Sequence, residues 1–146
     1  MDIAACTDLG RVRDGNEDSL LVLAPDVIAV ADGMGGHAAG EVASQQALET
    51  VKDLLANAGG ALDEQSVCAQ LTAAVAEANR QVYDLAKQAA YAGMGTTLTL
   101  ARLAQDKVFY AHVGDSRLYL YRAQKLRQIT FDHSLVAEML RHGYLT

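Results

Sequence analysis

The spacing of apolar residues changes twice along this chain, and that change limits the folds it can adopt. Short apolar runs come first, then two long segments with apolar residues every three or four positions, then short runs again. The short runs are typical of strands and the long segments of amphipathic helices. The expected strands are residues 3–7, 19–23, 27–31, 96–103, 108–113, 118–121 and 126–129, and the expected helices are residues 40–56 and 63–90. Strands, a helix pair and more strands indicate an α+β fold with an antiparallel sheet.

Residues that begin or end helices support these boundaries. Asn57 and the Gly59–Gly60 pair are expected to stop the first helix, and Asp63 or Ser66 can cap the second. A last helix is expected to begin near Ser134. Its apolar positions fall on one face: Leu135, Val136, Met139 and Leu140.

Composition narrows the functional classes. The formal net charge of −6 argues against nucleic acid and anionic membranes as partners. The start of the chain has no basic segment followed by an apolar one, so no signal peptide is expected. No apolar run approaches the roughly 18 residues of a membrane span. Cys6 and Cys68 are expected to be reduced core residues, and the protein is expected to be cytoplasmic.

Three acidic corners stand out because each lies where an expected strand meets a loop. They are Glu17–Asp18, Asp32–Gly33 and Asp115. A sheet can direct side chains from several strand ends at one point, and oxygen ligands suit hard cations such as Mg²⁺ and Mn²⁺. Gly33 would let its backbone carbonyl approach such an ion. Any one of these acids could equally be a turn residue or a helix cap, and the pattern alone leaves both interpretations open.

Five segments, in order, resemble the motifs of the PP2C (PPM) phosphatases, particularly their bacterial branch. They are residues 7–18 (TDLGRVRDGNED), 30–37 (VADGMGGH), 93–97 (GMGTT), 112–117 (HVGDSR) and 130–134 (TFDHS). The resemblance covers nearly the whole chain. It implies that residues 1–146 are the amino-terminal part of one PP2C-like domain. Such a domain is a sandwich of two antiparallel β-sheets flanked by α-helices, in four layers (αββα), and this chain is expected to lack its carboxy-terminal part.

The resemblance also implies an activity and assigns roles. The expected enzyme hydrolyses phosphoserine and phosphothreonine in proteins by attack of a hydroxide that bridges two metal ions. Asp18 and Asp32 would ligate the paired Mn²⁺ or Mg²⁺ ions, Glu17 would reach one ion directly or through water, and the Gly33 carbonyl would be a further ligand. Asp115 would hold a third, weaker ion, and Arg13 would bind the substrate phosphate.

These roles agree with the general chemistry of phosphoryl transfer. Paired cations can acidify a shared water, and the reaction demands positioning and charge neutralisation more than a nucleophilic side chain. A guanidinium group matches phosphate oxygens in geometry. Expected partners are phosphorylated proteins, among them a serine/threonine kinase and its substrates, and the complete protein is expected to be a monomer.

Other polar residues near the motifs are expected to be structural. Relatives from eukaryotes carry the proposed general acid directly after the Asp-Gly pair, where this chain has Met34, so the proton donor is not identified. His37 is expected to order the loop before the first helix, His112 to be a strand residue, and His133 to brace the turn after Asp132. Thr96 and Thr97 are expected to support the site from behind.

Two alternatives remain at this stage. The family completes its metal site with two later aspartates, in an Asp-Gly and an Asp-Asn motif, that nothing after Asp115 matches. The chain could therefore be a truncated, inactive domain that binds metal or phosphorylated partners. A nucleotide-phosphate loop at residues 33–40 is a weaker alternative, because the Gly-Lys-Ser/Thr ending of a P-loop is absent.

Overall fold

The computed structural model describes residues 2–23, 25–35, 39–56, 63–104 and 106–145. The sequence predictions for His37 and for the helix stop at Asn57 and Gly59–Gly60 lie outside these residues. Within them, none of the helices is both long and apolar enough to cross a membrane.

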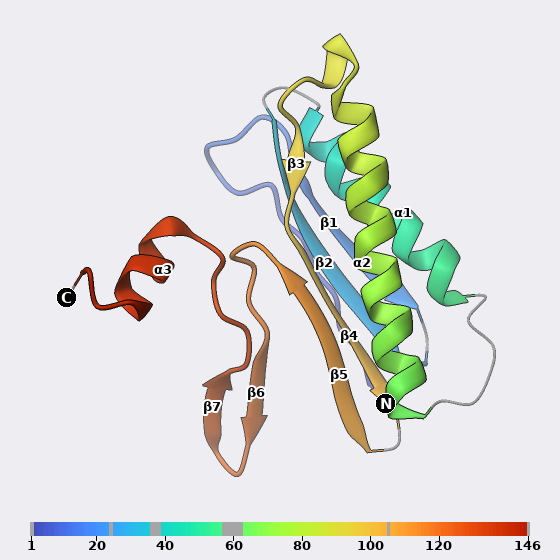
Figure 1. Ribbon diagram of the computed structural model, residues 1–146, viewed down its shortest axis with the longest axis vertical. Helices are drawn as coiled ribbons and strands as arrows, with labels where there is room; N and C mark the ends of the chain where they lie inside the picture. The colour runs from blue at the N-terminus through green and yellow to red at the C-terminus, as the bar shows by residue number, and fades with distance from the viewer. Residues whose placement is uncertain (1, 24, 36–38, 57–62, 105, 146) are drawn as a thin grey trace.

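The larger of two antiparallel sheets contains five strands (Figure 1). Its hydrogen-bonded order is β1 (Asp18–Leu23), β2 (Val27–Met34), β4 (Leu98–Ala104) and β5 (Lys107–Val113), and the short β3 (Gly95–Thr96) pairs with the end of β2. In the β1–β2 register, Asp18 lies opposite Asp32, and in the β2–β3 register Gly33 lies opposite Thr96. Acidic and threonine residues thus meet at one end of the sheet.

Two helices cover one face of this sheet (Figure 1). α1 (Ala39–Ala56) packs on β1 and β2, and α2 (Glu64–Ala86) packs on α1 and contacts β4 and β5. Alternate residues of β2 are buried beneath the helices, as expected for a strand with period two. Each helix buries a stripe of apolar residues at helical spacing, and the alanines among them let the helices pack closely on each other and on the sheet. These residues are Ala43, Ala47, Val51 and Leu55 in α1, and Val67, Leu71, Ala74, Ala78 and Val82 in α2.

The second sheet is a hairpin of β6 (Tyr119–Arg122) and β7 (Lys125–Gln128). Its two turn residues, Ala123 and Gln124, both have positive φ angles, 50° and 59°. This is the backbone geometry of a type I′ turn, which normally uses Asn and Gly. The hairpin leads to α3 (Leu135–Arg141), and both lie apart from α1 and α2 in Figure 1.

The predicted α+β architecture of two antiparallel sheets with helices is confirmed, and so are the cap of α2 at Asp63 and the start of the last helix near Ser134. Asp63 accepts a hydrogen bond from the Ser66 backbone, and Ser134 accepts one from the Ala137 backbone. In the part of the chain that the structure describes, helices cover one face of the larger sheet. The complete four-layer sandwich remains an expectation.

Several predicted boundaries were wrong. Residues 3–7 form no strand, because no described segment supplies them with a hydrogen-bonded partner. β2 continues past Ala31 to Met34, since β3 gives it a neighbour there. The strand expected over 96–103 is divided at Thr97, and α2 ends at Ala86, followed by a 3₁₀ turn, η1 (Ala89–Tyr91). Neither cysteine is in the core, because both Cys6 and Cys68 are exposed.

A buried ion pair joins the sheet to α2. The Arg102 side chain is only 7% exposed, and its Nε donates to Asp26 Oδ2 over 2.9 Å. Its Nη1 donates to Gln70 Oε1 on α2 over 2.6 Å. The buried guanidinium thus has hydrogen-bond acceptors on two segments, the turn before β2 and helix α2. These bonds hold the start of β2 beside β4.

Asp26→Ala is expected to lower the free energy of unfolding by about 2–3 kcal/mol, because it removes the carboxylate that pairs with the buried Arg102 charge. Urea denaturation of the protein and the variant measures the difference. Asp84→Ala, which breaks exposed pairs with Arg80 and Lys87, is the control and should change stability far less. Equal effects of the two variants would contradict the role of the Asp26–Arg102 pair.

Candidate metal and phosphate site

The centre of the site is a pair of aspartates on neighbouring strands. Asp18 begins β1 and lies opposite Asp32 of β2, and the two carboxyl groups are within hydrogen-bonding reach of each other. The backbone N–H of Asp18 donates to Asn16 Oδ1 over 3.0 Å, which shapes the end of the preceding loop. Asn16 in turn donates to Thr7 Oγ1 over 2.8 Å. These two hydrogen bonds fix the loop to β1 at its first residue, Asp18.

Two threonines hold the backbone of Asp32 from the neighbouring segment. The Asp32 N–H donates to Thr97 Oγ1 over 2.9 Å. Its carbonyl accepts from Thr96 Oγ1 over 3.0 Å and from the Thr97 N–H over 2.9 Å. This confirms the prediction that Thr96 and Thr97 support the site, and it explains why the strand breaks at Thr97.

The pKa of the Asp32 carboxyl is raised above its usual 3.8. Loss of hydration is the first cause, and the negative charges of Asp18 and Asp115 follow, while Arg13 acts in the opposite direction. Carboxylates that crowd one another in this way are destabilised as long as nothing positive lies between them. The corner therefore has the electrostatics of a cation site.

Glycines bring the first helix against this corner. A Cβ at Gly33 would lie 2.0 Å from the Gly40 carbonyl oxygen, and a Cβ at Gly40 would lie 2.6 Å from Glu17 Cδ. Ser44 Oγ donates to the Glu17 carbonyl over 2.6 Å. The Glu17 carboxylate therefore lies against the first turn of α1, where the helix dipole favours negative charge. Sequence reasoning missed Gly40 and Ser44.

Arg13 lies in the loop before β1. Its side chain is 75% exposed, and its Nη1 is 3.8 Å from Glu17 Oε2. The loop, including Arg11 and Arg13, lines a cavity of about 310 Å³ that also contains Asp18 and Asp32. An extended guanidinium beside two carboxylates is placed to meet an anion that enters this cavity.

Asp115 lies in a tight corner after β5. Gly114 precedes it with a φ of +106°, and a Cβ there would come within 2.6 Å of Thr97 Cγ2. Ser116 follows it, with its Oγ 2.7 Å from Thr97 Oγ1. The corner is thus packed on the same threonine that binds the Asp32 backbone.

The donor atoms gathered here are all oxygens, which suits Mg²⁺ or Mn²⁺. The structure brings Asp18 and Asp32 together, but it does not unite them with Glu17 or Asp115 in one coordination group. Among the residues described, no three His, Cys, Asp or Glu side chains are close enough to hold a metal ion. The predicted ligand set therefore stays a prediction, with one carboxylate pair already in place.

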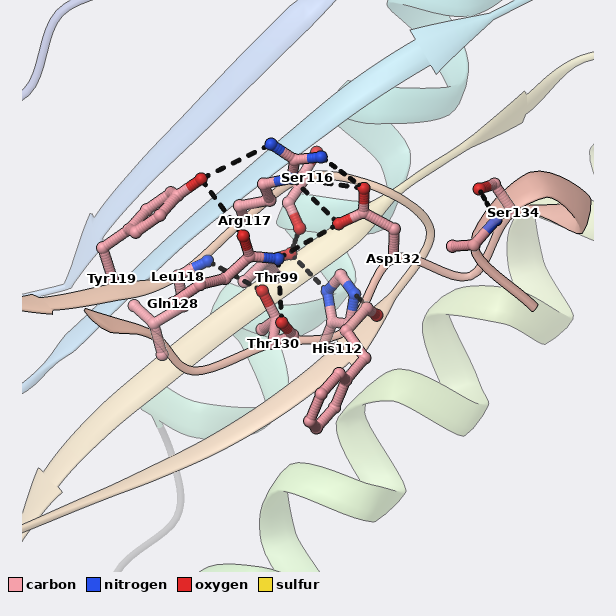
Figure 2. Close-up of polar contacts among 12 residues, drawn as sticks. Thr99, His112, Ser116, Arg117, Leu118, Tyr119, Gln128, Thr130, Asp132 and Ser134 are labelled. Carbon is pink, nitrogen blue, oxygen red and sulfur yellow. Dashed lines mark hydrogen bonds and ion pairs between the residues drawn. The ribbon is translucent and has the colours of Figure 1, made fainter. Parts of the chain in front are cut away.

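Polar contacts tie the segment after β7 to the sheet (Figure 2). Arg117 donates to both carboxylate oxygens of Asp132, from Nε over 2.9 Å and from Nη2 over 2.6 Å. His112 contacts Thr99 Oγ1 at 2.8 Å through Nδ1 and the Phe131 carbonyl at 3.1 Å through Nε2. Since the histidine lies between two structural partners, its predicted role as a structural strand residue is confirmed.

The same segment also supports the Asp115 corner. The His133 N–H donates to the Gly114 carbonyl over 2.8 Å. His133 therefore braces the corner before Asp115, in keeping with its predicted structural role. The Arg117 guanidinium, at the end of the same motif, is held by Asp132.

We expect Asp32→Asn to stabilise the protein when no divalent cation is present. The amide removes one negative charge and can still donate a hydrogen bond to Asp18, and solvent screening limits the gain to a rise in Tm of about 1–3 °C. Because the pKa of Asp32 is raised in the folded state, its ionisation costs stability above that pKa. Below that pKa, as the pH falls toward 3.8, the difference in Tm between the unaltered protein and Asp32→Asn should disappear.

Thermal melts in EDTA at pH 7 and pH 4 measure this difference. Asp106→Asn is the matched control, since Asp106 lies in the turn at the opposite end of the sheet and Asn tolerates its φ of 62°. A lower Tm for Asp32→Asn at pH 7 would contradict the proposed repulsion.

Comparison with known proteins shows a consistent set of relatives. The family described as Protein phosphatase 2C matches residues 12–138. The serine/threonine phosphatase stp of Listeria monocytogenes is 41% identical over 145 residues, which cover 96% of this chain and 58% of that protein. Protein phosphatase PhpP of Streptococcus pneumoniae is 39% identical over 152 residues, covering 100% of this chain and 61% of its own length.

Solved structures show the same similarity. The serine/threonine phosphatase PstP/Ppp of Mycobacterium tuberculosis superposes with a TM-score of 0.84 at 41% identity, over 95% of this chain and 57% of that one. The catalytic domain of PstP in complex with two manganese ions gives a TM-score of 0.83 over 59% of its length. The chain thus spans less than two thirds of the length of these relatives.

Proposed function

Because this chain belongs to the protein phosphatase 2C family, we propose that the protein is a Mn²⁺- or Mg²⁺-dependent phosphatase that hydrolyses phosphoserine and phosphothreonine in proteins. The observation that carries the proposal is the Asp18–Asp32 pair, held face to face with the pKa of Asp32 raised. The manganese-bound PstP structure and the names of the relatives support it. The substrates would be phosphorylated proteins, among them those of a serine/threonine kinase, in the cytoplasm.

We assign the metal-binding roles to residues of the carboxylate corner. Asp18 and Asp32 would hold the paired ions with the Gly33 carbonyl, Glu17 would assist one of them, and Asp115 would hold a third, weaker ion. Divalent cations supply positive charge for the phosphate and lower the pKa of water. The donor set fits them: the pKa of Asp32 is raised by loss of hydration and then by the charges of Asp18 and Asp115, and added positive charge would offset that repulsion.

Phosphate binding and the positioning of Asp32 are assigned to residues around the cations. Arg13 would bind and orient the phosphate from the solvent-exposed side of the cavity, since its side chain is 75% exposed and lines the cavity together with Asp18 and Asp32. Thr96 and Thr97 keep Asp32 at a constant position through its backbone. Phosphoryl transfer depends on such positioning more than on a protein nucleophile.

Asp32→Asn should abolish Mn²⁺-dependent hydrolysis of a phosphothreonine peptide while circular dichroism stays unchanged. The test uses the protein expressed from its complete gene, with Asp106→Asn as the control that keeps its activity. A variant with more than about a tenth of the original rate, a loss below 1.4 kcal/mol, would contradict the role of Asp32. Metal and phosphopeptide binding without any turnover by the unaltered protein would favour the alternative of a non-catalytic domain.

Arg13→Ala should weaken phosphate binding without emptying the metal site, because Arg13 offers hydrogen-bond donors but no ligand atom. The inhibition constant for inorganic phosphate should rise roughly tenfold, as expected for the loss of a charged hydrogen bond. Calorimetric Mn²⁺ affinity should change little. Arg11→Ala is the matched control from the same loop; if Mn²⁺ binding collapses in Arg13→Ala, Arg13 is a structural residue.

A further inference from the structure

Two serines line the cavity of about 400 Å³ that contains Asp18 and Asp32. They are Ser19 on β1 and Ser116 after Asp115. Each is paired with another hydroxyl, Ser19 with Ser44 at 2.9 Å and Ser116 with Thr97 at 2.7 Å. A hydroxyl has one hydrogen to donate, so each pair can be examined for an unused donor.

The hydrogens of the Ser19–Ser44 pair are both used. Ser44 Oγ donates to the Glu17 carbonyl over 2.6 Å, within a fully buried side chain. Its hydrogen is therefore committed, and in the 2.9 Å contact Ser19 must donate to Ser44. Ser19 has no hydrogen left for the cavity.

The Thr97–Ser116 pair leaves one hydrogen over. The contact between the Thr97 and Ser116 hydroxyls uses one of the two hydrogens that these hydroxyls carry. Thr97 Oγ1 also accepts the N–H of Asp32. Ser116 lines the cavity, whereas Thr97 does not belong to its lining. The remaining hydrogen is satisfied best when Thr97 donates to Ser116 and Ser116 donates into the cavity.

We propose that the Ser116 hydroxyl donates a hydrogen bond to an oxygen of the phosphate group bound beside Asp18 and Asp32. This assignment rests on the proposed function and adds a substrate contact to it. The chain Asp32 N–H to Thr97 Oγ1 to Ser116 Oγ, with steps of 2.9 and 2.7 Å, holds the serine at a constant distance from the aspartate corner.

Arg117, the cation that also lines this cavity, is held by both oxygens of Asp132. Ser116 therefore supplies a donor on a side of the cavity where the arginine is already engaged. A hydroxyl is small and neutral, so it can approach a phosphate oxygen without displacing cations from the carboxylates.

Ser116→Ala in the protein expressed from its complete gene tests the proposal. At saturating Mn²⁺, its calorimetric Kd for inorganic phosphate should rise about tenfold, the low end for a hydrogen bond to a charged group. Mn²⁺ affinity and Tm should stay near their original values. Ser19→Ala is the matched control and should leave phosphate binding unchanged, and Ser116→Thr, which keeps a hydroxyl, should restore it.

Each other outcome is decisive. An unchanged phosphate Kd in Ser116→Ala overturns the assignment, and so does a loss of Mn²⁺ affinity equal to that of Thr97→Val, which would make Ser116 only a support for Asp32. Failure of the unaltered protein to bind phosphate or hydrolyse a phosphopeptide with Mn²⁺ would overturn the proposed function itself. The two failures are therefore distinguishable.

Discussion

Backbone pairing between β1 and β2 forces Asp18 and Asp32 together although their charges repel. The ladder runs from Leu23–Val27 at one end to Asp18–Asp32 at the other, and burial of alternate β2 residues under α1 fixes its register. A slip by one residue would turn the buried alanines outward and separate the carboxylates. The apolar core therefore stabilises an arrangement of charges that the charges themselves oppose.

Close backbone packing extends this constraint to the rest of the site. Gly33 and Gly40 let the start of α1 touch the end of β2, and Ser44 ties the helix to the loop carbonyl of Glu17. On the other side, Thr97 joins Asp32 to the Asp115 corner through Ser116. Segments far apart in sequence are thus held to the same pair of strands.

The sequence predicted the elements well because periodicity reports which face of an element is buried. It also placed Asp18 and Asp32 at strand ends, and an antiparallel pair brings such ends together. It could not predict that β2 reaches Met34, since that depends on β3 about 60 residues later. Gly40 resembled an ordinary helix start, and the Thr97–Ser116 contact depends on tertiary packing that no local pattern reports.

The hairpin of β6 and β7 has a consequence for the order of folding. Ala123 and Gln124 adopt left-handed backbone angles that cost side-chain-bearing residues about 1 kcal/mol each. A hairpin with such a turn is a poor folding nucleus, because the conformation of its turn is itself unfavourable. Arg117, Asp132 and Thr130 bind across its base, and the Thr130 hydroxyl accepts the Leu118 N–H over 3.0 Å. We therefore expect the helices and the larger sheet to assemble first, and the hairpin to close late, from its base toward its tip.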